Sequence, residues 1–184
     1  DISTSYGMRD RALLELLYAS GLRVSEIVSL DVKQVDISMR QIRVRGKGSK
    51  ERMVLMGEPA ARALGAYLKF GRPKLLGKRK TEALFLNRYG RRIAERRVQY
   101  LLKAYAKQIG LGDRIHPHMV RHTFATHMLD GGADLRVVLE LLGLASLSST
   151  QVYTHVTKGQ MRRRYLEAHP RSRRSAGEDE AGCR

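Results

Sequence analysis

The sequence predicts a mainly helical α+β domain with one small antiparallel β-hairpin. Apolar residues recur at helical spacing over residues 8–19 and 98–109. Between them, residues 41–45 alternate polar and apolar side chains, residues 46–49 (Gly-Lys-Gly-Ser) are typical of a turn, and residues 53–56 resume an apolar strand. The change of period from about 3.6 to two distinguishes the hairpin from the helices.

Three helices are expected in the first half of the chain. The pattern of residues 8–19 stops at Gly21, and a short helix should follow over about residues 25–30. Pro59 suits the first turn of a third helix, because the N–H that proline lacks has no partner in that turn. The apolar face of this helix continues to Leu68.

The second half is expected to be helical apart from residues 83–93, which allow one more short strand and a turn. In addition to the helix over residues 98–109, helices should begin at Pro117, Asp134, Ser148 and about residue 158. The glycines after Asp130 and at Gly143 end the first two of these. The third starts with the S-x-x-Q form of a capping box and carries Tyr153 in its early turns.

The charge of the chain indicates a polyanionic partner. Its 184 residues contain 35 Lys and Arg against 18 Asp and Glu, a formal net charge of +17. Such an excess favours nucleic acid. An anionic membrane surface would need a basic amphipathic helix or an apolar run of about 18 residues, and neither is found in the sequence.

We expect one compact domain over residues 1–170 and a disordered tail over residues 171–184, where the sequence is polar and strongly charged. The single cysteine, Cys183, cannot form an internal disulfide and suits a reducing, cytoplasmic compartment. Because the chain starts at Asp1 without an initiator methionine, we expect a further N-terminal part that this sequence does not include.

Three scattered segments carry polar residues that a core would not favour. Arg23 precedes a helix and has Glu26 three residues later on the same side, although a surface ion pair would give the same pattern. Lys47 lies between two glycines at the hairpin turn, where a purely solvated lysine is also common. His118 and Arg121 lie one above the other on a helix face.

The histidines offer an alternative interpretation, a metal site formed by His116, His118 and His122. No acidic ligand is close in sequence, and Arg121 within the cluster would repel a cation. We therefore expect no metal and no other cofactor.

Together these residues favour chemistry on a phosphodiester. Planar arginine side chains match the oxygens of a phosphate, on which charge develops during cleavage. Tyr153 would be a poor nucleophile alone, because a tyrosine has a pKa near 10, but His118 could act as its base in a positive field. Lys47 is the preferred proton donor to the departing alkoxide, with Lys50 as its competitor.

The order of these segments resembles a known family. "LRVSE", "RVRGKGSKER", "HPHMVRHTFATHML", "LLG" and "STQVYTHV" follow one another as in the catalytic domain of tyrosine recombinases, most closely the bacterial Xer-type enzymes that resolve chromosome dimers. The resemblance covers about residues 8–170. It implies the tyrosine recombinase catalytic-domain fold, double-stranded DNA as the partner, and an N-terminal core-binding domain outside this chain. It also implies a homo- or hetero-tetramer on DNA formed through the C-terminal helix.

The resemblance also implies a role for each matching residue. Arg23 and Arg121 resemble the phosphate-clamping arginines, Lys47 the general acid and His118 the base. Tyr153 resembles the nucleophile, which forms a 3′-phosphotyrosyl link and frees a 5′-hydroxyl. The activity this implies is site-specific strand breaking and rejoining without metal or nucleotide, in chromosome dimer resolution or in integration.

Two further positions complete the comparison. Glu26 resembles a supporting acid of the site. Leu144 occupies the position where the family has histidine or tryptophan, and a leucine side chain cannot donate a hydrogen bond to the phosphate. Leu144 thus supports the alternative of a DNA-binding, recombinase-like protein with impaired or no catalysis. A type IB topoisomerase, which uses similar chemistry, is a third possibility.

Overall fold

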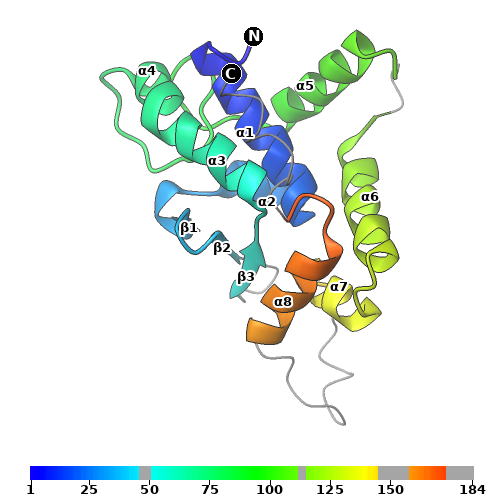
Figure 1. Ribbon diagram of the computed structural model, residues 1–184. Coiled ribbons are helices and arrows are strands. Elements are labelled where there is room, and N and C mark those ends of the chain that lie inside the picture. Colours follow the sequence, from blue (N-terminus) through cyan, green and yellow to red (C-terminus); the bar gives the residue numbers. More distant parts are fainter. Residues whose placement is uncertain (46–50, 112–114, 145–157, 173–184) are drawn as a thin grey trace, which may run out of the picture.

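The computed structural model describes residues 1–45, 51–111, 115–144 and 158–172. Helices form most of this part, and a small antiparallel sheet lies beside them (Figure 1). The prediction of a mainly helical α+β domain is confirmed. No helix in the described ranges is long and apolar enough to cross a membrane.

Helix α1 (Ser5–Ser20) is the central element of the larger apolar core. The side chain of Thr4 accepts a hydrogen bond from the Gly7 N–H at its start, and Gly21 ends it in the left-handed conformation with φ 60°. Its buried face includes Leu13 and Leu16, as the helical spacing predicts. Helix α1 packs most extensively against α3 (Glu58–Ala66).

Gly21 is the point at which the two apolar cores meet. A Cβ atom at this position would lie 2.5 Å from the ring of Phe124 on α6 (Pro117–Asp130), so a larger residue would push α6 away. The short helix α2 (Val24–Ser29) begins three residues after Gly21. The close approach therefore brings the start of α2 next to α6.

The sheet has three antiparallel strands in the order β1–β2–β3: β1 (Val35–Asp36), β2 (Gln41–Arg45) and β3 (Glu51–Leu55). The predicted hairpin is formed by β2 and β3, with Val44 opposite Arg52, while the turn residues 46–50 lie outside the described residues. The short strand β1, which follows the 3₁₀ turn η1 (Val32–Gln34), was not predicted.

The helix expected from Pro59 is longer than its apolar pattern. After α3 the chain continues through the π-helical turn η3 (Tyr67–Gly71) into α4 (Arg72–Leu76). Pro73 has no N–H to donate to the preceding turn, which is consistent with a widened turn just before it. Residues 83–93 form two isolated β-bridges and no strand, so the strand expected there is wrong. Asn87 folds this segment back on itself, because its Oδ1 accepts from the N–H groups of Tyr89 and Arg91.

The remaining helices are α5 (Glu95–Gln108), α6, α7 (Leu135–Leu141) and α8 (Lys158–Ala168). Side chains of α6, α7 and α8 form the second apolar core, at the right and bottom of Figure 1. It is tied to the first where the Tyr165 hydroxyl donates to the Ala19 carbonyl at 2.7 Å. Arg171 and Ser172, expected to start the tail, contact the domain, and residues 173–184 lie outside the described residues.

Candidate active site

The turn between α1 and α2 presents Arg23 to solvent and buries Glu26. One carboxylate oxygen of Glu26 accepts the backbone N–H of Arg23 at 2.8 Å, which satisfies a free donor at the start of α2. The Arg23 side chain is 44% exposed, whereas that of Glu26 is 9% exposed. The pair is therefore more than a surface ion pair, because its acidic member belongs to the interior.

Helix α6 carries Arg121 into the same region. Its Nη1 donates to the carbonyl of Gly21 at 2.6 Å and its Nη2 donates to the carbonyl of Leu142 at 2.7 Å. Among the described residues, no carboxylate forms an ion pair with Arg121. Arg121 is therefore fixed in position by neutral carbonyl groups, and the negative charge of Glu26 acts on it only from beyond ion-pair distance.

The electrostatic cost of this arrangement appears in the pKa of Arg121. Burial, with a smaller contribution from the nearby Arg23, lowers that pKa from 12.5 to about 10. Arg121 remains protonated at neutral pH because its pKa is still well above seven. An anion bound beside both arginines would relieve their repulsion and offset the burial of the charge.

Arg23, His118 and Arg121 line one cavity of about 150 Å³. The cavity lies between α2, α5 and the start of α6, and α5 contributes Glu95 and Gln99 to its wall. The structure thus brings together three of the residues singled out by the sequence. Glu95 and Gln99 were missed, because their exposed positions on an amphipathic helix look like an ordinary solvated face.

Glu26 is bound most closely by an arginine that the sequence analysis did not single out. Arg52 on β3 donates Nη1 to Oε1 at 2.8 Å and Nη2 to Oε2 at 3.0 Å. Burial of the Glu26 carboxyl opposes its ionisation, but the hydrogen bonds from Arg52 and from the Arg23 N–H outweigh this and lower its pKa. The carboxylate is therefore charged at neutral pH.

The alternation of side chains in the hairpin contains a signal for the contact between Arg52 and Glu26. Arg52 pairs with Val44, and residues directly opposite in an antiparallel sheet lie on the same face. Val44 is 1% exposed, so Arg52 lies on the buried face of the strand. A charged residue there indicates a buried partner of opposite charge.

Leu144 follows the end of α7 on the surface. Its backbone N–H donates to the Leu139 carbonyl at 2.8 Å, and the residue is 50% exposed. Gly143 has φ +65°, the left-handed conformation that favours glycine at a helix end. The apolar side chain therefore lies just beyond Leu142, whose carbonyl binds Arg121.

Two of the residues proposed for the chemistry, Lys47 and Tyr153, lie outside the described residues, as does Lys50. The structure therefore gives no contact or distance for them. Their roles stay predictions.

The histidines of α6 differ in environment. His116, His118 and His122 are all exposed, but His116 also caps the helix by accepting the Met119 N–H through Nδ1 at 3.3 Å. Across the described ranges, no group of three His, Cys, Asp or Glu side chains is close enough to hold a metal ion. His116 thus has a local structural role in starting α6.

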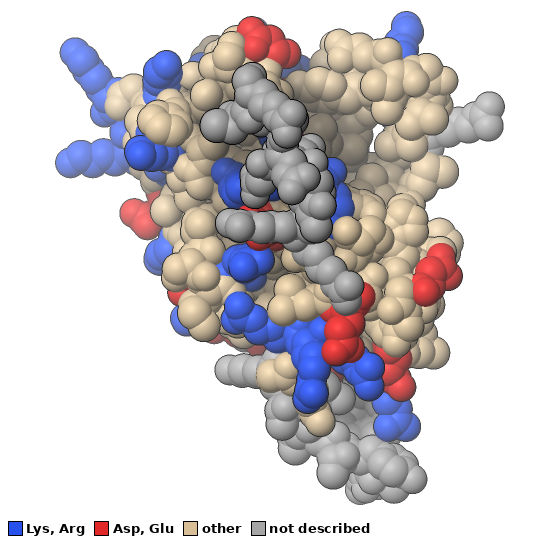
Figure 2. Space-filling model, in the orientation of Figure 1, with Lys and Arg blue, Asp and Glu red and all other residues tan. Residues whose placement is uncertain are grey.

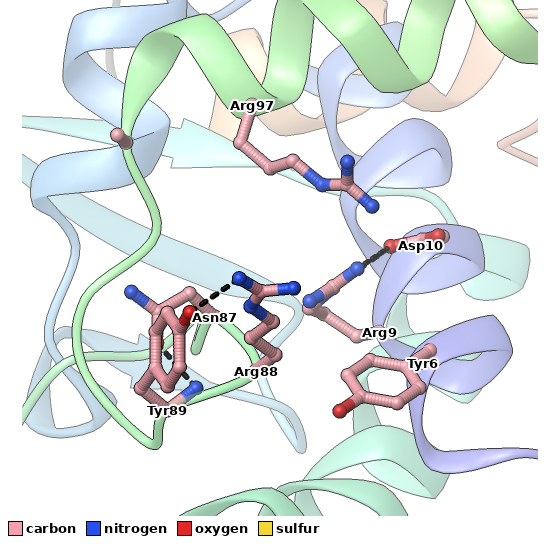
Figure 3. A pocket seen from close by; sticks show the side chains of 8 residues that line it. Tyr6, Arg9, Asp10, Asn87, Arg88, Tyr89 and Arg97 are labelled. Atoms are coloured by element: carbon pink, nitrogen blue, oxygen red, sulfur yellow. Dashed lines mark hydrogen bonds and ion pairs between the residues drawn. The ribbon is translucent and has the colours of Figure 1, made fainter.

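A larger cavity of about 750 Å³ lies beside α1, the segment after Leu86 and the start of α5 (Figure 3). Arg9, Arg88 and Arg97 border it, but Arg9 is paired with Asp10 at 2.6 Å and donates to the Leu86 carbonyl at 3.0 Å. The buried charge of Arg9 is thus compensated within the chain. None of the residues predicted for catalysis lines this cavity.

Among the charged side chains on the face shown in Figure 2, basic ones predominate. They gather near α4 at the upper left and over α8 at the bottom. Exposed basic residues of these elements are Lys74 in α4, Arg79 shortly after it, and Arg163 and Arg164 in α8. The excess positive charge of the sequence is therefore spread over more than one part of this face.

The fold is that of tyrosine recombinase catalytic domains. The crystal structure of XerA recombinase matches with a TM-score of 0.71 and 33% identity, over 91% of this chain and 60% of that one. XerH site-specific recombinase, in its pre-cleavage complex with difH substrate, matches with a TM-score of 0.69 and 28% identity, over 90% of this chain and 48% of that one.

The family model for the phage integrase family matches residues 1–160, and the chain belongs to this family. Tyrosine recombinase XerC of Bacillus pumilus (strain SAFR-032) is 51% identical over 175 residues, which cover 94% of this chain and 57% of that protein. The chain thus spans little more than half the length of this relative. The resemblance seen in the sequence is confirmed at the level of the family.

Proposed function

We propose that this chain is the catalytic part of a site-specific DNA recombinase, which breaks and rejoins strands through a 3′-phosphotyrosyl intermediate. The observation that carries the proposal is the convergence of Arg23, His118 and Arg121 on one cavity. Two arginine side chains and a histidine around one cavity suit a phosphodiester, on whose oxygens negative charge develops during cleavage. The family relation and the net charge of +17 support DNA as the substrate.

In the proposed reaction the Tyr153 oxygen attacks the scissile phosphorus and its proton passes to His118. Arg23 and Arg121 bind the non-bridging oxygens as charge builds up. The bond to the 5′ oxygen breaks, and Lys47 protonates that oxygen. A 5′-hydroxyl from another strand then attacks the phosphotyrosine and gives its proton to Lys47, while the departing Tyr153 oxygen takes a proton back from His118. The bond energy is conserved, so no nucleotide is consumed.

The proposed setting is exchange between two duplexes, as in chromosome dimer resolution or integration. Four copies of a recombinase would be needed, and we propose that contacts of the C-terminal helix help to join them. Within this chain α8 packs on α6, and Tyr165 is 1% exposed. Cross-linking with and without a DNA duplex carrying two binding sites measures the assembly.

The experiment that tests the activity is formation of a covalent adduct on a nicked suicide substrate, in which the cleaved strand cannot be rejoined. Wild type should produce an adduct of slow mobility in a denaturing gel, and Tyr153→Phe should produce none. His122→Asn controls for a substitution outside the cavity and should still form the adduct, because His122 is an exposed histidine of α6 that does not line the cavity.

The alternative of a DNA-binding protein without chemistry rests on Leu144. It predicts binding of the duplex but no adduct from the wild-type chain under any condition. An adduct from Leu144→His alone would identify a site impaired at this one position. An adduct from neither protein would overturn the proposed activity.

A further inference from the structure

Arg52 and Glu26 form the tightest ion pair beside the cavity. The two hydrogen bonds, at 2.8 Å and 3.0 Å, give the parallel arrangement that a guanidinium and a carboxylate favour. The side chains are 17% and 9% exposed, so solvent screens the pair weakly. Glu26 therefore has its main counter-charge on the interior side.

The contact between Glu26 and the Arg23 side chain is weaker in geometry. Nη1 of Arg23 lies 3.4 Å from Oε1 of Glu26, an oxygen that already accepts from Arg52 at 2.8 Å. The other carboxylate oxygen accepts from Arg52 and from the Arg23 backbone N–H. With its oxygens thus engaged, Glu26 does not draw the Arg23 guanidinium away from the cavity.

Arg52 also contacts the end of α7. A Cβ atom on Gly143 would lie 3.0 Å from Cζ and 3.1 Å from Nε of Arg52. Because glycine has no Cβ, the backbone can lie directly against the guanidinium. One side chain on β3 therefore contacts both α2, through Glu26, and the residue that precedes Leu144.

We propose that Arg52 is a positioning residue, which holds the Glu26 carboxylate and so reserves the Arg23 guanidinium for the scissile phosphate. The inference rests on the proposed function, because the phosphate is the group that Arg23 would bind. Arg52 acts through Glu26 and Arg23, and its side chain does not line the cavity.

The proposal has a specific consequence for a chain without the Arg52 charge. In Arg52→Met the partly buried Glu26 carboxylate has lost its main partner, and Arg23 is the other arginine in contact with it. Glu26 then pairs fully with Arg23 and withdraws it from the phosphate. Adding Glu26→Gln removes the charge that captures Arg23, while the amide oxygen can still accept the Arg23 backbone N–H.

The test compares single-turnover adduct formation on the nicked substrate for wild type, Arg52→Met and Arg52→Met/Glu26→Gln. Arg52→Met should slow cleavage by about 10- to 100-fold, less than complete loss of a transition-state donor can cost. Affinity for the duplex should change less than about threefold, because most phosphate contacts remain. The double variant should recover at least half of the lost rate on a logarithmic scale.

Recovery in the double variant separates positioning from a merely structural role. Glu26→Gln also removes an uncompensated buried charge and can restore stability by itself, so cleavage is compared well below the melting temperature of every variant, where all are folded. Under these conditions a merely structural role leaves Arg52→Met as fast as wild type, with no lost rate to recover. A double variant no faster than Arg52→Met overturns the proposal. Arg72→Met is the control for general destabilisation, since Arg72 is a part-buried arginine bonded to the Ala83 and Thr81 carbonyls away from the cavity.

The test includes a second variant at Arg52 and a second background at Leu144. Should Arg52→Met fail to fold, Arg52→Lys replaces it, because lysine keeps the charge but cannot form the paired hydrogen bonds. The series is also run with Leu144→His. If neither background gives a Tyr153-dependent adduct, the proposed function fails; if an adduct forms and Arg52→Met does not slow it, only the role of Arg52 is wrong.

Discussion

Arg121 donates a hydrogen bond of 2.6 Å to the carbonyl oxygen of Gly21, 100 residues earlier in the chain. Its second bond, to Leu142, reaches the end of α7. A single guanidinium thus holds together the segment that leads into Arg23 and the segment that leads into Leu144. The Arg121 side chain therefore provides both the link between the two segments and a positive charge beside the cavity.

Substitution of Arg121 by lysine should separate these two contributions. A lysine keeps the positive charge but cannot donate in two fixed directions to the carbonyls of Gly21 and Leu142. We expect adduct formation to fall by about 100-fold, comparable to removal of one transition-state donor. Single-turnover cleavage measures this, and a DNA titration should show affinity within a few-fold of wild type. A rate equal to that of wild type would show that charge alone suffices.

Replacement of Leu144 by histidine should accelerate the chemical step. The side chain is exposed at the end of α7 and has no donor, whereas an imidazole N–H could reach a bound phosphate. By analogy with one oxyanion donor, the gain should be about 100- to 1,000-fold. Leu144→Phe is the control for a change of size without a donor. Equal rates for Leu144→His and wild type would mean that this position contributes nothing to the phosphate.

Gly143→Ala should disturb the contact between α7 and Arg52. Alanine at φ +65° costs about 1–2 kcal/mol of backbone strain, and its Cβ would also lie within 3.2 Å of three guanidinium atoms. Gly132→Ala is a matched control, since Gly132 has φ +84° with nothing within 4 Å of its Cβ position. Urea unfolding should show the larger loss for Gly143→Ala. Only that variant should also slow cleavage.

His169 should make the domain sensitive to acid. The residue is 2% exposed; its Nδ1 accepts the Arg171 N–H at 3.1 Å, and its ring stacks on Tyr165 with centroids 5.0 Å apart. Burial lowers its pKa from 6.5 to about 4, an effect that His127 and Arg171 reinforce and a backbone contact with Tyr18 opposes. The folded chain thus keeps this imidazole neutral at a pH where the unfolded chain protonates it.

The direction of the effect follows from linkage. The stabilisation is complete above pH 6.5 and is lost as the pH falls from 6.5 towards 4. The loss is about 1.4 kcal/mol per pH unit, or about 3 kcal/mol in all. The free energy of unfolding, measured in urea at several pH values, should fall less steeply in His169→Phe than in wild type. Parallel curves for the two proteins would contradict the assignment.

Local patterns in the sequence predicted those parts of the site that depend on neighbours along the chain. Arg23 with Glu26, and His118 with Arg121, are each three residues apart, so helical geometry alone relates them. The glycine after α1 predicted where that helix ends. That Arg23, His118 and Arg121 meet at one cavity followed from their shared phosphate chemistry, since no spacing in the sequence relates residue 23 to residue 118.

The features that were missed depend on contacts between distant segments. Arg52 binds Glu26 across 26 positions, and Glu95 faces the cavity only because α5 packs near α2. Strand β1 has two residues, too few for an alternating pattern to be visible. Residues 83–93 have an apolar start typical of a strand, but their polar groups are satisfied by a turn around Asn87 and by single bridges.

Gly21 and Arg121 are 100 residues apart in the sequence, which affects the order in which the site can form during synthesis. During translation the first apolar core can form early, since α1, the sheet, α3 and α5 all precede residue 109. The paired bonds of Arg121 need α6 and the Leu142 carbonyl as well, so they can form only after α7 has left the ribosome. A nascent chain therefore carries Arg23 without the second arginine fixed at its side until residue 142 has emerged. The two arginines proposed to bind phosphate can lie side by side only after that point.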